Sequence, residues 1–278
     1  MQEQLIDRGF VRLDEGLIHY RERAAADGDT APPLLLLHAS PNSSQAVEPI
    51  MQAYAPGRRL LAPDNPGNGD SVRPAGEQPA MRDYADMLDR FCTALDLEAV
   101  DIFGSHTGAH IGLELAMLRP ERVRRIVVDG ILVLDTAARD DFLANYAPPK
   151  QPDKTGTQFH WVWQYVRDQM IFFPHYRKDA DHQRAGGIFD AGFLHRMALD
   201  VLRALDTYHL AYEAVFRHEV GACLAAIQQP IRWLDTGEGY LDDGMRLMRE
   251  TATAASVVEV AHGPAEFAAA IEAFCADS

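Results

Sequence analysis

The chain has 278 residues, 47% hydrophobic and 24% charged, which suits one α/β domain with an insertion and a large buried core. Its 26 basic residues stand against 41 acidic ones, and the formal charge of −15 argues against nucleic-acid backbones and anionic membranes as partners. Because Met1–Gln4 lacks a signal-peptide pattern and no apolar run reaches bilayer length, we expect a cytoplasmic protein.

The first predicted elements belong to a sheet. Phe10–Leu13 and Leu17–Arg23 flank a short turn and predict a β-hairpin. Leu34–Leu37 follows two prolines and is apolar at every position, as is typical of a parallel strand buried on both faces. Strands and helices then alternate, with strands predicted at 59–62, 100–103 and 126–128 and helices at 81–97 and 109–118. This alternation predicts an α/β fold with a mostly parallel, doubly wound sheet.

The pattern changes after Asp129. Residues 132–224 contain helical stretches and no predicted buried strand. The last predicted elements are strands at 231–234 and 257–260 and a closing amphipathic helix that carries Phe267, Ile271 and Phe274. We therefore predict a helical cap inserted after the sixth strand, with the core at residues 1–131 and 226–278 and the cap at residues 132–225.

Four motifs follow one another along these elements. They are His38-Ala39-Ser40-Pro41 after a buried strand, D-x-x-G-x-G-x-S at 64–71, Gly104-Ser105-His106-Thr107-Gly108 between a strand and a helix, and Arg119-Pro120-Glu121-Arg122-Val123. In this order and context they resemble the α/β-hydrolase superfamily over nearly the whole chain. The resemblance implies an α/β-hydrolase fold with a nucleophile elbow at 104–108.

The elbow departs from the family at its tip. The resemblance places the nucleophile at the central residue, where the hydrolases have Ser, Cys or Asp, and this chain has His106. Ser105 as the nucleophile in a shifted register is the alternative, although it breaks the spacing of the motif. The resemblance also implies an oxyanion hole formed by the backbone N–H groups of Ser40 and Thr107.

The resemblance suggests partners for His106. His262 follows the last predicted strand, where the family has its base, but the loop after it is shorter than usual. Asp129 follows the strand after the elbow helix, where haloalkane dehalogenases place the acid, and it is our first candidate for that role. Glu238, after the strand at 231–234, is the second.

Other residues are candidates for substrate contact. His38 either braces the oxyanion loop, as in the family, or faces the substrate. Trp161 and Trp163, in the predicted cap, either line a pocket or pack in the cap core. His110, one turn after His106, is interpreted as a buried packing residue.

We therefore predict a cofactor-independent enzyme that acts on a small, partly apolar carbonyl or ester compound. Acid–base chemistry by His106 and His262, lyase-like or hydrolytic, is the first hypothesis. A hydrolase with a rerouted nucleophile or activated water, or a catalytically silent ligand-binding protein, is the alternative. We expect no metal, either at His38, His106 and His262 or at the three widely spaced cysteines, and the sequence leaves a homodimer open.

Overall fold

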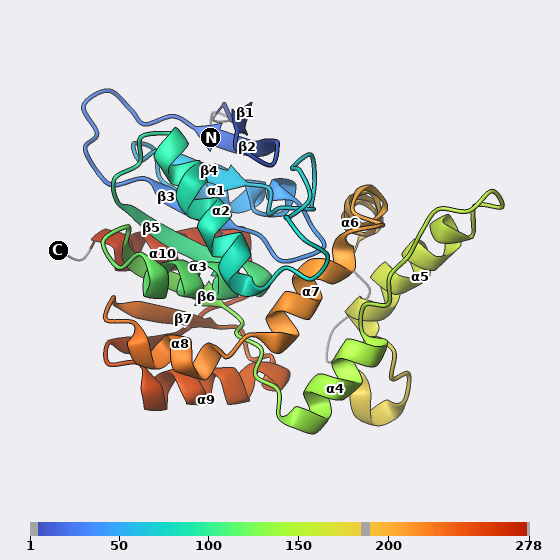
Figure 1. Cartoon of the computed structure of the whole chain (residues 1–278). Coiled ribbons are helices and arrows are strands. Elements are labelled where there is room, and N and C mark those ends of the chain that lie inside the picture. Colours follow the sequence, from blue (N-terminus) through green and yellow to red (C-terminus); the bar gives the residue numbers. More distant parts are fainter. Residues whose placement is uncertain (1–4, 185–189, 277–278) are drawn as a thin grey trace.

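A central eight-stranded sheet organises the chain in the computed structural model, which describes residues 5–184 and 190–276 (Figure 1). The strand order is β1-β2-β4-β3-β5-β6-β7-β8. The strands are β1 (Asp7–Arg12), β2 (Leu17–Arg23), β3 (Leu34–Leu37), β4 (Leu60–Pro63), β5 (Val100–Ser105), β6 (Val123–Asp129), β7 (Ile231–Asp235) and β8 (Ala255–Glu259). The pairs β1–β2 and β2–β4 are antiparallel and the others are parallel, so the predicted fold class is confirmed.

Helices cover both faces of the sheet. One face packs against α1 (Glu48–Ala53) and α10 (Pro264–Ala276). The other face packs against α2 (Met81–Ala94), α3 (Thr107–Leu118), α8 (Val220–Ala226) and α9 (Asp242–Thr251). Short 3-10 turns lie at Ser44–Ala46, Ala180–His182 and Gly239–Leu241.

Strand β3 shows why its sequence is apolar at every position. Leu35 and Leu37 join the hydrophobic cluster beneath α2 and α3, whereas Leu34 and Leu36 join the cluster beneath α1 and α10. All four side chains are 0% exposed because side chains alternate between the two covered faces. The central strands are thereby anchored, and their carboxyl ends carry the candidate site.

Between β6 and β7, four helices precede α8 in the described part of the chain. They are α4 (Thr136–Asn145), α5 (Thr157–Ile171), α6 (Ala191–Arg203) and α7 (Tyr208–Arg217), and Figure 1 shows α4 to α6 grouped to one side of the sheet. Aromatic rings fill the space among them, for example Phe142 stacked on Tyr146 at 5.1 Å between centroids. Within 132–184 and 190–224 the structure forms no strand beyond the isolated bridge between Phe172 and Gln183.

Several element boundaries differ from the predictions by one to three residues, and two of these differences have a local consequence. The helix predicted at 81–97 ends at Ala94, because the chain turns at Asp96 with φ 55°. The strand predicted at 126–128 runs from Val123 to Asp129, so Asp129 lies at the carboxyl end of this strand. No helix among the described residues is long and apolar enough to cross a membrane.

Candidate active site

The turn between β5 and α3 is a sharp elbow with His106 at its tip. His106 has φ 46° and ψ −107°, a conformation that costs a non-glycine residue roughly 1–3 kcal/mol. A Cβ at Gly108 would lie 2.2 Å from the carbonyl oxygen of Leu37, and one at Gly104 would lie 2.6 Å from the Ala109 backbone. The two glycines are therefore a steric requirement of the elbow.

The imidazole of His106 lies against Gly130, the residue after β6. A Cβ at Gly130 would stand 2.8 Å from both Cε1 and Nδ1 of His106, and 3.1 Å from Leu241. The backbone N–H of His106 donates a hydrogen bond to the carbonyl oxygen of Asp129 at 2.9 Å. The side chain of His106 therefore packs against Gly130 on one side, and because it is partly exposed it remains accessible to solvent on another.

Ser105 precedes the tip and faces the neighbouring strand. It is paired with Asp129 in the register of β5 and β6, and its hydroxyl donates a hydrogen bond to Oδ2 of Asp129 at 3.2 Å. The serine hydroxyl is therefore hydrogen-bonded at the carboxyl ends of β5 and β6, and His106 occupies the tip of the elbow.

Asp129 is the carboxylate that faces the elbow. Burial raises the pKa of its carboxyl, and the nearby charge of Glu238 raises it further. The charges of His106 and His262 and the hydrogen bond from Ser105 lower that pKa without cancelling the rise. A half-buried carboxylate next to an imidazole favours a positive charge on that imidazole.

Glu238, the second candidate acid, is held by other groups. Arg184 Nη2 donates a hydrogen bond to it at 2.5 Å, and the hydroxyl of Tyr240 donates another. Arg184 also stands 5.3 Å above the Tyr240 ring, whose centroid is 3.9 Å from that of Phe173. Glu238 thus links the segment before α6 to the loop after β7, while its charge acts on Asp129.

His262 lies in the short loop between β8 and α10. Its side chain is exposed, and its ring centroid is 5.7 Å from that of Phe267. In residues 5–184 and 190–276 no hydrogen bond joins His262 to His106 or Asp129, although its charge lowers the pKa of Asp129. The structure therefore places it within electrostatic range of the carboxylate and out of hydrogen-bond contact.

The loop after β3 is braced by His38. The ring is 0% exposed, its Nε2 accepts a hydrogen bond from the Asn65 N–H at 2.8 Å, and its Nδ1 lies 2.9 Å from the carbonyl oxygen of Ala39. A carbonyl only accepts, so His38 is a neutral imidazole that donates from Nδ1. Nδ1 is used within this loop and Nε2 by Asn65 of the loop after β4, which leaves neither nitrogen for a ligand.

The two oxyanion-hole candidates keep free backbone donors. Ser40 is 6% exposed and its hydroxyl donates to Oδ1 of Asn68 at 3.3 Å, while Thr107 is the first residue of α3. Neither the Ser40 N–H nor the Thr107 N–H donates a hydrogen bond to another group in the described part of the chain. Free N–H groups at a helix N-terminus suit a developing negative charge.

Asp64 has a structural role that its sequence motif did not reveal. Its carboxylate accepts hydrogen bonds from the Ser44 N–H at 2.6 Å, the Asp70 N–H at 2.9 Å and His19 Nδ1 at 2.8 Å. Burial raises its pKa, but the hydrogen bond from His19 and the other donors outweigh burial and hold it far below the usual range. Arg8 donates to Nε2 of His19 at 2.9 Å, so the His19 proton lies on Nδ1.

Helix α6 and the turn after it contact the core loops. Asp200 accepts hydrogen bonds from both the N–H and the hydroxyl of Ser43, each at 3.0 Å. The Thr207 hydroxyl donates to the carbonyl of Gly67 at 2.5 Å. No sequence signal pairs these residues, because each contact joins segments far apart in the chain.

The two candidate tryptophans differ in their surroundings. Trp161 stacks on Tyr165 with 4.9 Å between centroids, and Lys150 Nζ lies 5.2 Å from its ring. Trp163 is 44% exposed on α5. Trp161 packs in the aromatic core among the helices, and Trp163 faces solvent.

The sheet topology and the glycine-flanked elbow are those of the α/β hydrolases, and comparison with known proteins agrees. The model of the family described as "alpha/beta hydrolase fold" matches residues 32–184, more than half of the chain. The chain therefore belongs to this family, as the sequence motifs predicted.

Curated relatives match over part of their length. The chain is 38% identical over 101 residues to 2-hydroxymuconate semialdehyde hydrolase of Pseudomonas sp. strain CF600, covering 35% of this chain and 36% of that one. It is 34% identical over 113 residues to haloalkane dehalogenase 2 of Mycobacterium tuberculosis, covering 41% and 38% respectively. The chain thus spans little more than a third of the length of these relatives.

Solved structures share the fold over nearly the full chain. Cfl2 of Burkholderia cenocepacia has a TM-score of 0.71 at 19% identity, with 97% of this chain and 95% of that one covered. Haloalkane dehalogenase DatA of Agrobacterium tumefaciens C58 has a TM-score of 0.70 at 18% identity, with 97% and 96% covered. At these identities the likeness concerns the fold alone.

Proposed function

We propose that this protein is an enzyme that acts on a small, partly apolar carbonyl or ester compound, with His106 as its central acid–base residue. The observation that carries the proposal is the position of His106 at the strained tip of the elbow. Backbone strain of this kind persists where the surrounding structure enforces it, and the elbow tip is where the fold presents its reacting group.

In the proposed hydrolytic reaction, an uncharged His106 accepts a proton from water as the water oxygen bonds to the substrate carbonyl carbon. The carbonyl oxygen becomes negative and receives hydrogen bonds from the N–H groups of Ser40 and Thr107. The bond to the leaving oxygen then breaks, and His106 returns the proton to that oxygen. In the non-hydrolytic variant, His106 removes a proton next to the carbonyl and the same donors stabilise the enolate.

Asp129 and His262 have unequal roles in this proposal. Asp129 stabilises the imidazolium that forms on His106, which agrees with the favourable charge interaction of the two groups. His262 acts through its charge at the rim of the site, since it is exposed and lies outside hydrogen-bond contact. This arrangement makes His106 the group whose loss is most damaging.

One of the matched relatives supports a carbonyl compound as substrate class. One matched relative is named as the hydrolase of a semialdehyde, and the haloalkane dehalogenases belong to the same set of matches. We further propose that helices α4 to α7, within residues 132–225, form a cap over the core of residues 1–131 and 226–278, and that the reaction needs no cofactor. The proposed setting is the cytoplasm, with the monomer or a homodimer as the working form.

The test compares the wild-type protein with His106→Ala on a panel of esters, lactones and 1,3-dicarbonyl compounds. We expect turnover in the wild type and its loss in the variant, with an unchanged far-UV circular dichroism spectrum. Full activity in His106→Ala would contradict the proposed mechanism. Covalent labelling by a fluorophosphonate that disappears in Ser105→Ala would show a serine hydrolase instead, and tight binding without turnover would show a ligand-binding protein.

A further inference from the structure

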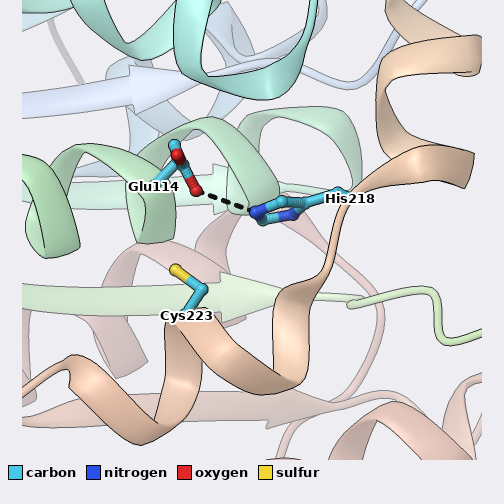
Figure 2. Close-up of side chains that lie close together, drawn as sticks. All are labelled: Glu114, His218 and Cys223. Carbon is cyan, nitrogen blue, oxygen red and sulfur yellow. Dashed lines mark hydrogen bonds and ion pairs between the residues drawn. The ribbon is translucent and has the colours of Figure 1, made fainter.

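Three side chains of metal-binding type meet on the side of α3 that faces α8. They are Glu114 on α3, His218 directly after α7 and Cys223 on α8, and Figure 2 shows them around one point. A carboxylate oxygen, an imidazole nitrogen and the sulfur all lie within 4.8 Å of one another. The sequence did not predict this cluster, since 104 residues separate Glu114 from His218.

The cluster is buried yet bordered by a cavity. Glu114 is 6% exposed and Cys223 is 1% exposed. A cavity of about 330 Å³ is lined by all three residues, and it offers both a route for an ion and room for a water molecule. Two cationic side chains also line it, but Arg217 is paired with Glu213 at 2.8 Å and Arg82 with Asp86 at 3.7 Å.

The hydrogen-bond chain behind the cluster identifies Nε2 as the metal-binding nitrogen of His218, because Nδ1 faces His110. The Leu132 N–H donates to Nε2 of His110 at 3.2 Å, so His110, which is neutral, carries its proton on Nδ1. Burial, together with the charges of His218 and His106, lowers the pKa of His110 well below its ordinary value. His110 Nδ1 then donates to Nδ1 of His218 at 2.8 Å, and His218 Nε2 donates to Glu114 at 2.9 Å.

We propose that Glu114, His218 and Cys223 bind a zinc ion, with water from the cavity as the fourth ligand. Zinc accepts this mixture of sulfur, nitrogen and oxygen ligands in a tetrahedral site. One carboxylate and one thiolate neutralise its charge, which a buried site requires. With bond lengths of about 2.0–2.3 Å, tetrahedral ligand atoms stand about 3.3–3.8 Å apart, so shifts of about 1 Å complete the site.

Zinc binding also changes the hydrogen-bond chain. The ion replaces the proton on His218 Nε2 and the thiol proton of Cys223, and both protons leave to solvent. His218 takes the Nδ1 proton of His110, and His110 takes one proton from solvent on Nε2, for a net release of one proton. Nε2 of His110 then no longer accepts from Leu132, two residues after the Gly130 that supports His106.

The test uses Co²⁺ as a spectroscopic substitute for zinc in the full-length, chelator-treated protein. We expect one Co²⁺ per chain, a thiolate-to-cobalt charge-transfer band in the near ultraviolet, and displacement by Zn²⁺ but not by Mg²⁺. Cys223→Ser should abolish the band and weaken zinc binding beyond the roughly 10–100-fold that outer-sphere changes cost. Cys275→Ser, a free cysteine on α10 against the opposite face of the sheet, is the matched control and should keep the band and the affinity.

A second variant keeps the test independent of folding defects in the first. Glu114→Gln is nearly isosteric and can still accept from His218, so it should fold, keep the cobalt–thiolate band and bind zinc at least 10-fold more weakly. Absence of the band in the wild-type protein would overturn the proposal. So would equal zinc affinity in the wild type, Cys223→Ser and Glu114→Gln.

Discussion

Gly130→Ala tests whether the position of the His106 ring matters for turnover. Gly130 has φ +86°, and an alanine in this region costs about 1–2 kcal/mol of backbone strain. Its Cβ would stand 2.8 Å from two ring atoms of His106, whereas ordinary contacts begin near 3.4 Å, so the ring must move by about 0.6 Å. Because a misplacement of about 1 Å costs about 100-fold in rate, we expect kcat/KM to fall by about 10–100-fold.

The matched control is Gly76→Ala. Gly76 has φ +79°, and a Cβ there would meet nothing within 4 Å. It therefore carries similar backbone strain and disturbs no side chain. Urea denaturation should show a similar loss of unfolding free energy in both variants, and steady-state kinetics on the best substrate should show a rate defect in Gly130→Ala alone. Wild-type kcat/KM in Gly130→Ala, or an equal defect in Gly76→Ala, would refute the reasoning.

Three further predictions concern carboxylates, the half-buried Asp129 and the buried Asp64 and Asp200. Asp129→Asn should lower turnover by about 100-fold or more. It should also raise the melting temperature at pH 7, because folding raises the pKa of the wild-type carboxyl, which therefore loses its stability contribution as pH rises. This gain in melting temperature should vanish near pH 3, where the wild-type carboxyl is protonated in both the folded and the unfolded state. Asp64→Ala leaves three buried donors, His19 Nδ1 and two backbone N–H groups, without an acceptor. At about 1–3 kcal/mol for each unsatisfied group, we expect a loss of at least about 3 kcal/mol of unfolding free energy. A cost below about 1 kcal/mol in urea denaturation would contradict the role assigned to Asp64. Asp200→Ala should cost roughly 1–3 kcal/mol by unpairing Ser43 and should lower kcat at saturating substrate; an unchanged kcat would separate α6 from the oxyanion loop.

Much of the fold could be predicted from local sequence patterns. Leu34–Leu37 was predictable as a buried strand because the alternation of side chains places two leucines in each hydrophobic cluster. The elbow was predictable because Gly104 and Gly108 are the residues whose Cβ atoms would clash with neighbouring backbone. The sequence does not predict that the helix ends at Ala94, because the residue with left-handed backbone there is Asp96 and not a glycine.

Contacts between distant segments could not be predicted in this way. His19 and Asp64 are 45 residues apart, and His110 and His218 are 108 residues apart, so no period or motif relates them. His110 is buried as the sequence predicted, but its ring takes part in a hydrogen-bond chain that only the folded structure assembles. The place of His262 depended on the path of one short loop, which composition alone does not determine.

The contact between α6 and the loop after β3 connects this helix to one of the proposed oxyanion donors. Asp200 holds Ser43, and Ser43 is three residues from Ser40, whose N–H is one of the two proposed oxyanion donors. If α6 moved away, Ser43 would lose the acceptor of both its hydrogen bonds, whereas Ser40 would keep its bond to Asn68 and Ser44 its bond to Asp64. The position of α6 would therefore influence the proposed donor at Ser40 through the backbone of Ser43, without dismantling the loop.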